Sequence, residues 1–229
     1  MSFLTLIQDD GEPLVRWNWI SDHVHEFVDL TGQHLYLSLT PVVLGLLISV
    51  PLGVASVRWS WFYPPVFAGA NLLYAVPSLA LFMLMLDITG LDSPLTAIVP
   101  LTVYTLAVLI PNVVDGLRQV PEPVRQAATA MGFGATRRLI QVELPIAVPV
   151  IVAGLRVATV SSISLVSVAV LVGQGGLGQL FTDGAQREFP TPIIAGIALT
   201  IILAFSADLV LVLAQRLLTP WARDRRRTA

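Results

Sequence analysis

The residues with the clearest capacity for chemistry form a polar segment between two long apolar runs. The segment reads Arg125-Gln126-Ala127-Ala128-Thr129-Ala130-Met131-Gly132 and is followed, after nine residues, by Val142-Glu143-Leu144-Pro145. Its alanines would make one side of a helix thin enough for a partner's groove to approach closely, with arginines at the rim. This pattern favours non-covalent docking of another protein. Composition alone leaves one alternative open, an ordinary amphipathic loop between membrane spans.

The remaining reactive side chains do not form a catalytic set. His23, His25 and His34 lie before or at the start of the first apolar run, and Asp208 is an acid without a partner acid in another run. Without cysteine there is no disulfide, thiolate zinc site or cysteine nucleophile. The glycine-rich segment 172–178 lacks the Lys-Ser/Thr ending of a phosphate-binding loop, so its glycines are expected only to allow a tight backbone turn. We therefore expect no catalytic residue, metal or cofactor in this chain.

The elements that carry these residues are expected to be membrane helices. Hydrophobic residues make up 55% of the chain, charged residues 12%, and the mean hydropathy is +0.78. A helix needs about 20 mainly apolar residues to span a membrane. Five stretches meet this requirement, at residues 35–57, 65–86, 94–115, 146–172 and 192–216. The sequence predicts an all-α integral membrane protein with five transmembrane helices.

The arginines orient these spans. An odd number of spans places the termini on opposite sides, and one orientation gathers most arginines of the loops and tail inside: Arg58, Arg118, Arg125, Arg137, Arg138, Arg216, Arg223, Arg225, Arg226 and Arg227. Only Arg16 and Arg187 then lie outside. The positive-inside rule predicts an outer N-terminus and a cytoplasmic C-terminus. The run of arginines at 223–227 is interpreted as an anchor to lipid headgroups, without a role for nucleic acid.

Three regions follow from this layout. Residues 1–33 form an extracytoplasmic segment whose acidic start does not resemble a signal peptide. Its apolar residues recur at near-helical spacing and predict a short interfacial helix, with a disordered tail as the alternative: Trp17, Trp19, Ile20, Val24, Phe27 and Val28. Residues 34–217 form the transmembrane region, including a cytoplasmic loop at 118–145, and residues 218–229 form a basic tail.

Polar residues inside the spans are candidates for a hydrated path. They are Asn71 and Tyr74 on the second span, Tyr104 on the third, and Ser161 and Ser164 on the fourth. Small hydroxyls also allow close helix packing, which is the alternative for the serines. Prolines in the first four spans would kink them and suit a moving path, although proline is also commonly tolerated in membrane helices.

Two ionisable residues lie inside apolar runs. Arg156 on the fourth span and Asp208 on the fifth fall at similar depth in the cytoplasmic half when about 1.5 Å is counted per residue. An isolated charge at that depth is costly, and pairing within the bundle is the usual remedy. The sequence predicts a structural ion pair between them. The alternative is an arginine that snorkels to the interface and an aspartate that faces water.

The cytoplasmic loop is expected to fold as a helix-turn-helix. Pro121 and Pro123 suit a helix start, and the helix is expected over residues 124–131. Gly132 and Gly134 allow a left-handed turn. Thr136 is expected to cap a second helix that runs to Leu144 and is closed by Pro145.

This loop resembles the EAA loop of permease subunits of binding-protein-dependent ABC importers. The pattern is Glu-Ala-Ala, three residues, Gly, nine residues, Ile-x-Leu-Pro. The chain matches it without a gap at Ala127, Ala128, Gly132, Leu144 and Pro145. It departs at Gln126, where Glu is usual, which removes a charge, and conservatively at Val142, where Ile is usual.

Further segments resemble the subgroup that imports osmoprotectants. They are Val76-Pro77-Ser78-Leu79-Ala80, Val142-Glu143-Leu144-Pro145, Ala153-Gly154-Leu155-Arg156-Val157-Ala158-Thr159 and the glycine-rich segment 173–178. The resemblance covers nearly the whole chain from about residue 16. It implies the MetI-like fold of a type I ABC importer permease in a bacterial inner membrane, carrying glycine betaine, carnitine, choline or a similar solute.

The resemblance also implies the partners. The permease would pair with a second copy or a paralogue, receive solute from an extracytoplasmic binding protein, and seat its loop, including Arg125, in a groove of an ATPase subunit. That ATPase would bind ATP and Mg²⁺, so the chain itself would be a non-catalytic path. Two rival classes are an intramembrane enzyme, whose residues are missing, and a secondary transporter, which usually has inverted repeats that are not evident here.

Overall fold

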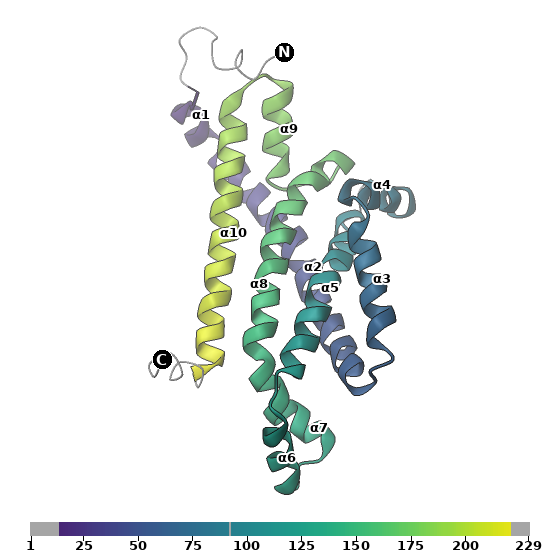
Figure 1. Ribbon diagram of the computed structural model, residues 1–229. Helices are drawn as coiled ribbons and strands as arrows, with labels where there is room; N and C mark the ends of the chain where they lie inside the picture. Colours follow the sequence, from purple (N-terminus) through teal and green to yellow (C-terminus); the bar gives the residue numbers. More distant parts are fainter. Residues whose placement is uncertain (1–13, 92, 221–229) are drawn as a thin grey trace. The chain divides into compact units, whose positions relative to one another are not determined.

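The computed structural model describes residues 14–91 and 93–220, and every regular element in these ranges is helical (Figure 1). The elements are α1 (Trp17–Asp22), α2 (Val24–Arg58), α3 (Tyr63–Ala75), α4 (Ser78–Thr89), α5 (Leu95–Arg118), α6 (Glu122–Ala130), α7 (Ala135–Arg138), a π-helical segment η2 (Leu139–Glu143), α8 (Leu144–Ala169), a 3₁₀ turn η3 (Val170–Val172), α9 (Gly178–Gln186) and α10 (Pro190–Leu218). Most of the predicted basic tail, including the arginines at 223–227, lies outside the described residues.

Four continuous helices in the described ranges are long and apolar enough to cross a membrane. They are Val24–Arg58, Leu95–Arg118, Ala135–Val172 and Pro190–Leu218, and each contains most or all of one predicted span. The first is longer than expected. It begins at Val24, so Phe27 and Val28 belong to α2 and not to the short helix before it, and the predicted boundary at residue 33 falls inside α2.

The second predicted span is broken. It consists of α3 and α4, which are bent by 93° at the Val76-Pro77 step, so the chain has five spans only if this bent pair counts as one. A residue before proline is disfavoured in the helical region, and Val76 is accordingly extended, with ψ 131°. The Tyr104 hydroxyl donates a hydrogen bond to the Val76 carbonyl and so satisfies a backbone group that the break exposes.

The described residues divide into two compact units. Each of the helices α2, α5, α8 and α10 contributes residues to both units. The described residues of the first unit are 14–40, 77–91, 93–101 and 161–205. Its core has two apolar clusters. One gathers around Phe82, Leu101 and Val166, and the other contains Phe27, Leu30, Leu177 and Leu180.

The described residues of the second unit are 41–76, 102–160 and 206–220. Its core cluster contains Val113, Leu117, Ala147 and Ile151 from α5 and α8, with partly buried residues of α2 packed against it. Lipid is as apolar as these side chains, so close packing has to hold membrane helices together. Gly154 shows how tight that packing is, because a Cβ added there would lie 2.5 Å from Cγ of Asn112.

Candidate functional site

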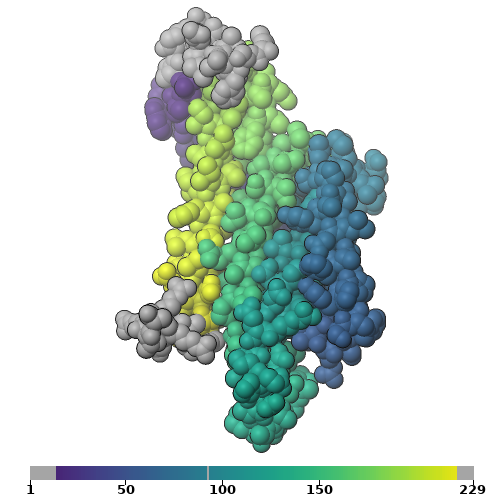
Figure 2. Space-filling model, in the orientation of Figure 1, coloured from purple at the N-terminus to yellow at the C-terminus, as the bar shows by residue number. Residues whose placement is uncertain are grey.

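The predicted docking segment forms a helical hairpin at the end of the second unit. Figure 1 shows α6 and α7 beyond the ends of α5 and α8, and Figure 2 shows their atoms as a projection left uncovered in that view. We call residues 118–145 the coupling hairpin, after the role that is proposed for it below.

Its turn has the geometry that the glycine signal predicts. Gly132 has φ +83°, the Gly132 N–H donates to the Thr129 carbonyl at 3.0 Å, and the Phe133 N–H donates to the Ala128 carbonyl at 3.1 Å. These two bonds define a Schellman motif that ends α6. Gly134 differs from the expectation, because its φ is −65° and it does not supply a left-handed turn.

The second half of the hairpin corrects two further expectations. Thr136 does not cap a helix, because Gly134 is the N-cap residue of α7 and no side chain caps it. Pro145 does not close a helix either: α7 continues through the π segment η2 into α8, where Pro145 lies in the first turn. Within this continuous helix Pro145 removes one N–H from the backbone ladder, directly after the π segment.

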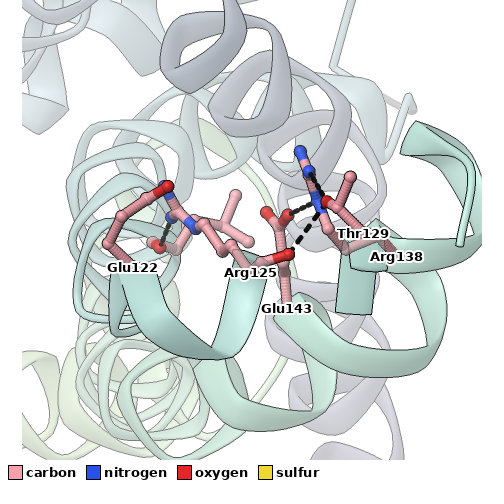
Figure 3. A network of polar contacts seen from close by, with 6 residues as sticks. Glu122, Arg125, Thr129, Arg138 and Glu143 are labelled. Atoms are coloured by element: carbon pink, nitrogen blue, oxygen red, sulfur yellow. Dashed lines mark hydrogen bonds and ion pairs between the residues drawn. The ribbon is translucent and has the colours of Figure 1, made fainter. Parts of the chain in front are cut away.

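A chain of polar contacts runs through the hairpin (Figure 3). Arg138 donates from Nε to Oε1 of Glu143 at 2.7 Å and from Nη1 to the Thr129 hydroxyl at 2.9 Å. The Thr129 hydroxyl donates to the Arg125 carbonyl at 2.9 Å, and Arg125 Nη2 donates to the Leu117 carbonyl at 2.6 Å. Of the three predicted rim arginines, Arg125 and Arg138 therefore bond within the hairpin, whereas Arg137 stays exposed.

The hairpin sorts the predicted docking residues into outward and inward sets. Gln126, Ala127 and Gly132 are exposed, whereas Ala128 is buried at 1% exposure. Arg125, Leu144 and Pro145 are half-buried, and Leu144 packs against the core cluster of the second unit.

Two large apolar residues of the hairpin are exposed. Met131 is 69% exposed and follows one turn after the exposed Ala127, and Ile140 of η2 is 58% exposed. Met131 lies within the predicted docking segment and directly precedes the turn glycine, whereas Ile140 falls in the nine residues between the two quoted motifs and was not singled out.

The two intramembrane charges meet in the second unit. Arg156 Nε lies 2.6 Å from Oδ1 of Asp208, and Arg156 Nη2 lies 2.8 Å from Oδ2. This is the bidentate geometry that a planar guanidinium and a carboxylate favour. The side chains are 37% and 26% exposed, so the pair lies at the edge of the packed helices and not in a sealed core.

The candidates for a hydrated path fall into three groups. Tyr74 and Tyr104 are brought together, with ring centroids 5.4 Å apart and planes at 75°. Asn71 is exposed on α3, one turn before Tyr74. Ser161 and Ser164 lie one turn apart on α8 in the first unit, Ser161 half-buried and Ser164 exposed, whereas the neighbouring Ser162 packs inward and donates to the Ser38 carbonyl at 2.8 Å.

A buried histidine in the first unit was not anticipated. His34 has 0% exposure, its Nε2 lies 2.9 Å from the Ile163 carbonyl, and its Nδ1 accepts the Leu177 N–H at 3.2 Å. A ring that accepts at Nδ1 and donates at Nε2 is the neutral form with its proton on Nε2. His34 therefore fastens the glycine-rich segment, where Gly173 and Gly176 have positive φ, to α2 and α8.

Residues 41–224 match the family described as the inner membrane component of binding-protein-dependent transport systems. The chain belongs to this family. It is therefore a permease, a multi-pass inner-membrane component of a transport system that works with a binding protein.

Curated relatives match the permease over most of its length. An osmoprotectant import permease of Salmonella typhimurium is 36% identical over 207 residues, covering 89% of this chain and 96% of the relative. A glycine betaine, carnitine and choline permease of Bacillus subtilis is 34% identical over 195 residues, covering 85% of this chain and 89% of the relative. A carnitine permease of Listeria monocytogenes is 30% identical over 204 residues, covering 89% and 93%.

Solved structures share the permease fold. A chain of an inward-facing methionine ABC transporter superposes with a TM-score of 0.69 at 22% identity, covering 83% of the permease and 96% of that chain. A chain of an amino acid ABC transporter superposes with a TM-score of 0.72 at 16% identity, covering 88% and 98%. These likenesses show the fold, which is the MetI-like fold expected from the sequence.

Proposed function

We propose that this permease forms half of the translocation path of an ATP-driven importer for compatible solutes such as glycine betaine, choline, carnitine or proline. The observation that carries the proposal is the 36% identity to an osmoprotectant import permease across 96% of that relative. A partner ATPase would bind ATP and Mg²⁺, a binding protein would deliver the solute, and a second permease subunit would complete the path.

The orientation is part of the proposal. Arg58, Arg118 and Arg216 lie in the last turns of α2, α5 and α10, and these helix ends belong to the second unit together with the coupling hairpin. Arg16 and Arg187 belong to the first unit. Arginine is enriched on the cytoplasmic side of membrane proteins. The second unit is therefore assigned to the cytoplasmic side, with the N-terminus outside and the C-terminus inside.

The coupling hairpin is assigned the role of ATPase contact. Its exposed apolar residues include Ala127, Ala130 and Met131, which share one side of α6 by their helical spacing, together with Ile140 on η2. Such a face buries well in a groove, and exposed apolar residues grouped together commonly mark protein contacts. Gln126 borders this face as an uncharged amide, so docking in this permease would not use a carboxylate at that position.

The tyrosine pair is assigned to the solute path. Tyr74 is 51% exposed, and Tyr104 supports it edge to face. Aromatic faces attract quaternary ammonium groups by cation–π interaction, which suits betaine, choline and carnitine. Asn71, Ser161 and Ser164 are proposed as neutral polar groups along the same path.

Reconstitution tests the proposal. The permease is purified with the proteins that its neighbouring genes encode, and uptake of labelled glycine betaine into vesicles is measured with and without ATP, with choline, carnitine and proline as competitors. We expect uptake that requires ATP. ATP hydrolysis without betaine uptake would overturn the solute assignment, and equal uptake after ATP depletion would indicate a secondary transporter.

A further inference from the structure

The coupling hairpin is fastened to α5 by a contact that replaces a missing helix bond. In a continuing helix the Leu117 carbonyl would accept from the N–H of residue 121, but that residue is Pro121, which has no N–H. The Val120 N–H donates to this carbonyl at 3.3 Å, and Arg125 Nη2 adds a second, shorter bond at 2.6 Å. Leu117 is 1% exposed and Val120 is 3% exposed, so the connection from α5 to α6 is packed as well as bonded.

The exit from the hairpin into α8 has no loop at all. The Leu144 N–H donates to the Leu139 carbonyl in the wider π pattern, just before Pro145 interrupts the ladder. Arg138 and Glu143, five residues apart, bridge this π segment at 2.7 Å. The Glu143 side chain is only 10% exposed, so the bridge braces the segment from its packed side.

Thr129 joins the two fastenings. Its hydroxyl accepts from Arg138 and donates to the carbonyl of Arg125, which links the exit of the hairpin to its entrance through α6. A hydroxyl can donate one bond while accepting others, so one side chain serves both directions. We call Arg125, Thr129, Arg138 and Glu143 the clamp (Figure 3).

We infer that the clamp makes the coupling hairpin rigid with the ends of α5 and α8, so that the hairpin transmits partner motion to the spans without flexing. The inference rests on the proposed function, in which an ATPase moves this hairpin. Clamp side chains are positioning residues, because the outward docking face is formed by other residues. Their loss should separate transport from ATP hydrolysis without preventing docking.

The test uses the complete reconstituted complex with Glu143→Gln and Arg138→Gln, and Arg137→Gln as the matched control. Arg137 lies on the same helix, but its bond to Gln141 Oε1, at 3.0 Å, is exposed and outside the clamp. Uptake per ATP hydrolysed is measured at equal amounts of assembled complex. We expect it to fall about two- to thirtyfold in both clamp variants, the range found for residues that modulate coupling. The control should keep the wild-type ratio.

The double exchange Arg138→Glu with Glu143→Arg should recover part of the lost ratio. Amide hydrogen exchange of residues 139–144 gives a second readout that does not depend on the solute, and it should accelerate in Glu143→Gln but not in Arg137→Gln. An unchanged ratio with unchanged exchange would overturn the inference. Loss of ATPase co-purification in Glu143→Gln would also overturn it, because the clamp would then serve docking. Absence of wild-type uptake would instead count against the proposed function, and exchange would still test the clamp.

Discussion

At the scale of single residues, two sets of hydrogen bonds satisfy the polar side chains that lie among the apolar helices. Arg156 and Asp208 neutralise each other through two hydrogen bonds in the second unit. His34 satisfies two backbone groups of the first unit without carrying a charge. Both follow the rule that a polar group away from water needs a partner, because an unpaired one is costly.

Charge reversal tests the ion pair. Arg156→Asp and Asp208→Arg should each lower the melting temperature of the detergent-solubilised permease by several degrees, because each places two like charges together. The double reversal restores opposite charges and should recover most of the loss. A double variant as unstable as the single variants would show that the pair does not stabilise the helices.

Replacement of His34 tests the buried histidine. His34→Leu leaves the Leu177 N–H and the Ile163 carbonyl without their partner, which costs about 1–3 kcal/mol for each group. We expect a clear loss of thermal stability in detergent. His25→Leu is the control, because His25 is exposed on the same helix. Equal stability of the two variants would rule out the fastening role of His34.

At the scale of elements, prolines and glycines decide where helices end, break or continue. Pro77 breaks the second span, and Pro121 separates α5 from α6. Pro145 does not end a helix, because α7 continues through η2 into α8. Side chains bond to carbonyls beside the first two prolines: Tyr104 donates to the Val76 carbonyl, and Arg125 donates to the Leu117 carbonyl.

Substitution of the turn glycine Gly132 tests the docking role proposed for the coupling hairpin. Gly132→Glu forces a side chain onto a residue with φ +83°, which costs about 1–2 kcal/mol, and it adds a charge beside the proposed docking face. It should abolish ATPase co-purification while the spans remain folded. Gly134→Glu adds the same group at φ −65° and should retain more binding. Retained ATPase coupling in Gly132→Glu would contradict the assigned docking role.

At the scale of the whole molecule, arginine is distributed by unit. The hairpin arginines and the last-turn arginines of α2, α5 and α10 belong to the second unit, and Arg16 and Arg187 to the first. The assigned membrane orientation depends on this distribution, because basic residues are retained on the cytoplasmic side.

The absence of native cysteine makes the orientation directly testable. Asn18→Cys and Thr136→Cys each introduce a single thiol at an exposed position of the cysteine-free sequence. In intact cells, a membrane-impermeant maleimide should label residue 18 and should reach residue 136 only after permeabilisation. The opposite labelling pattern would reverse the proposed orientation.

The sequence by itself determined what local patterns encode. Apolar runs located four spans within a few residues, except that the helices of the first and fourth predicted spans begin earlier than predicted. Gly132 located the turn, and spacing along the helices placed Arg156 and Asp208 at similar depth. Local periodicity and backbone restrictions act within a few residues, so one chain is enough to recognise them.

Only the tertiary structure decided which distant groups meet. His34 bonds to backbone groups 129 and 143 residues away in the sequence. The Tyr104 hydroxyl bonds to the carbonyl of Val76, 28 residues away, where the second span breaks. Arg138 and Glu143 are separated by five residues, a spacing that points to different sides of an α-helix and becomes a contact through the π segment. These partners are selected by the packing of whole helices, which local residue patterns do not specify.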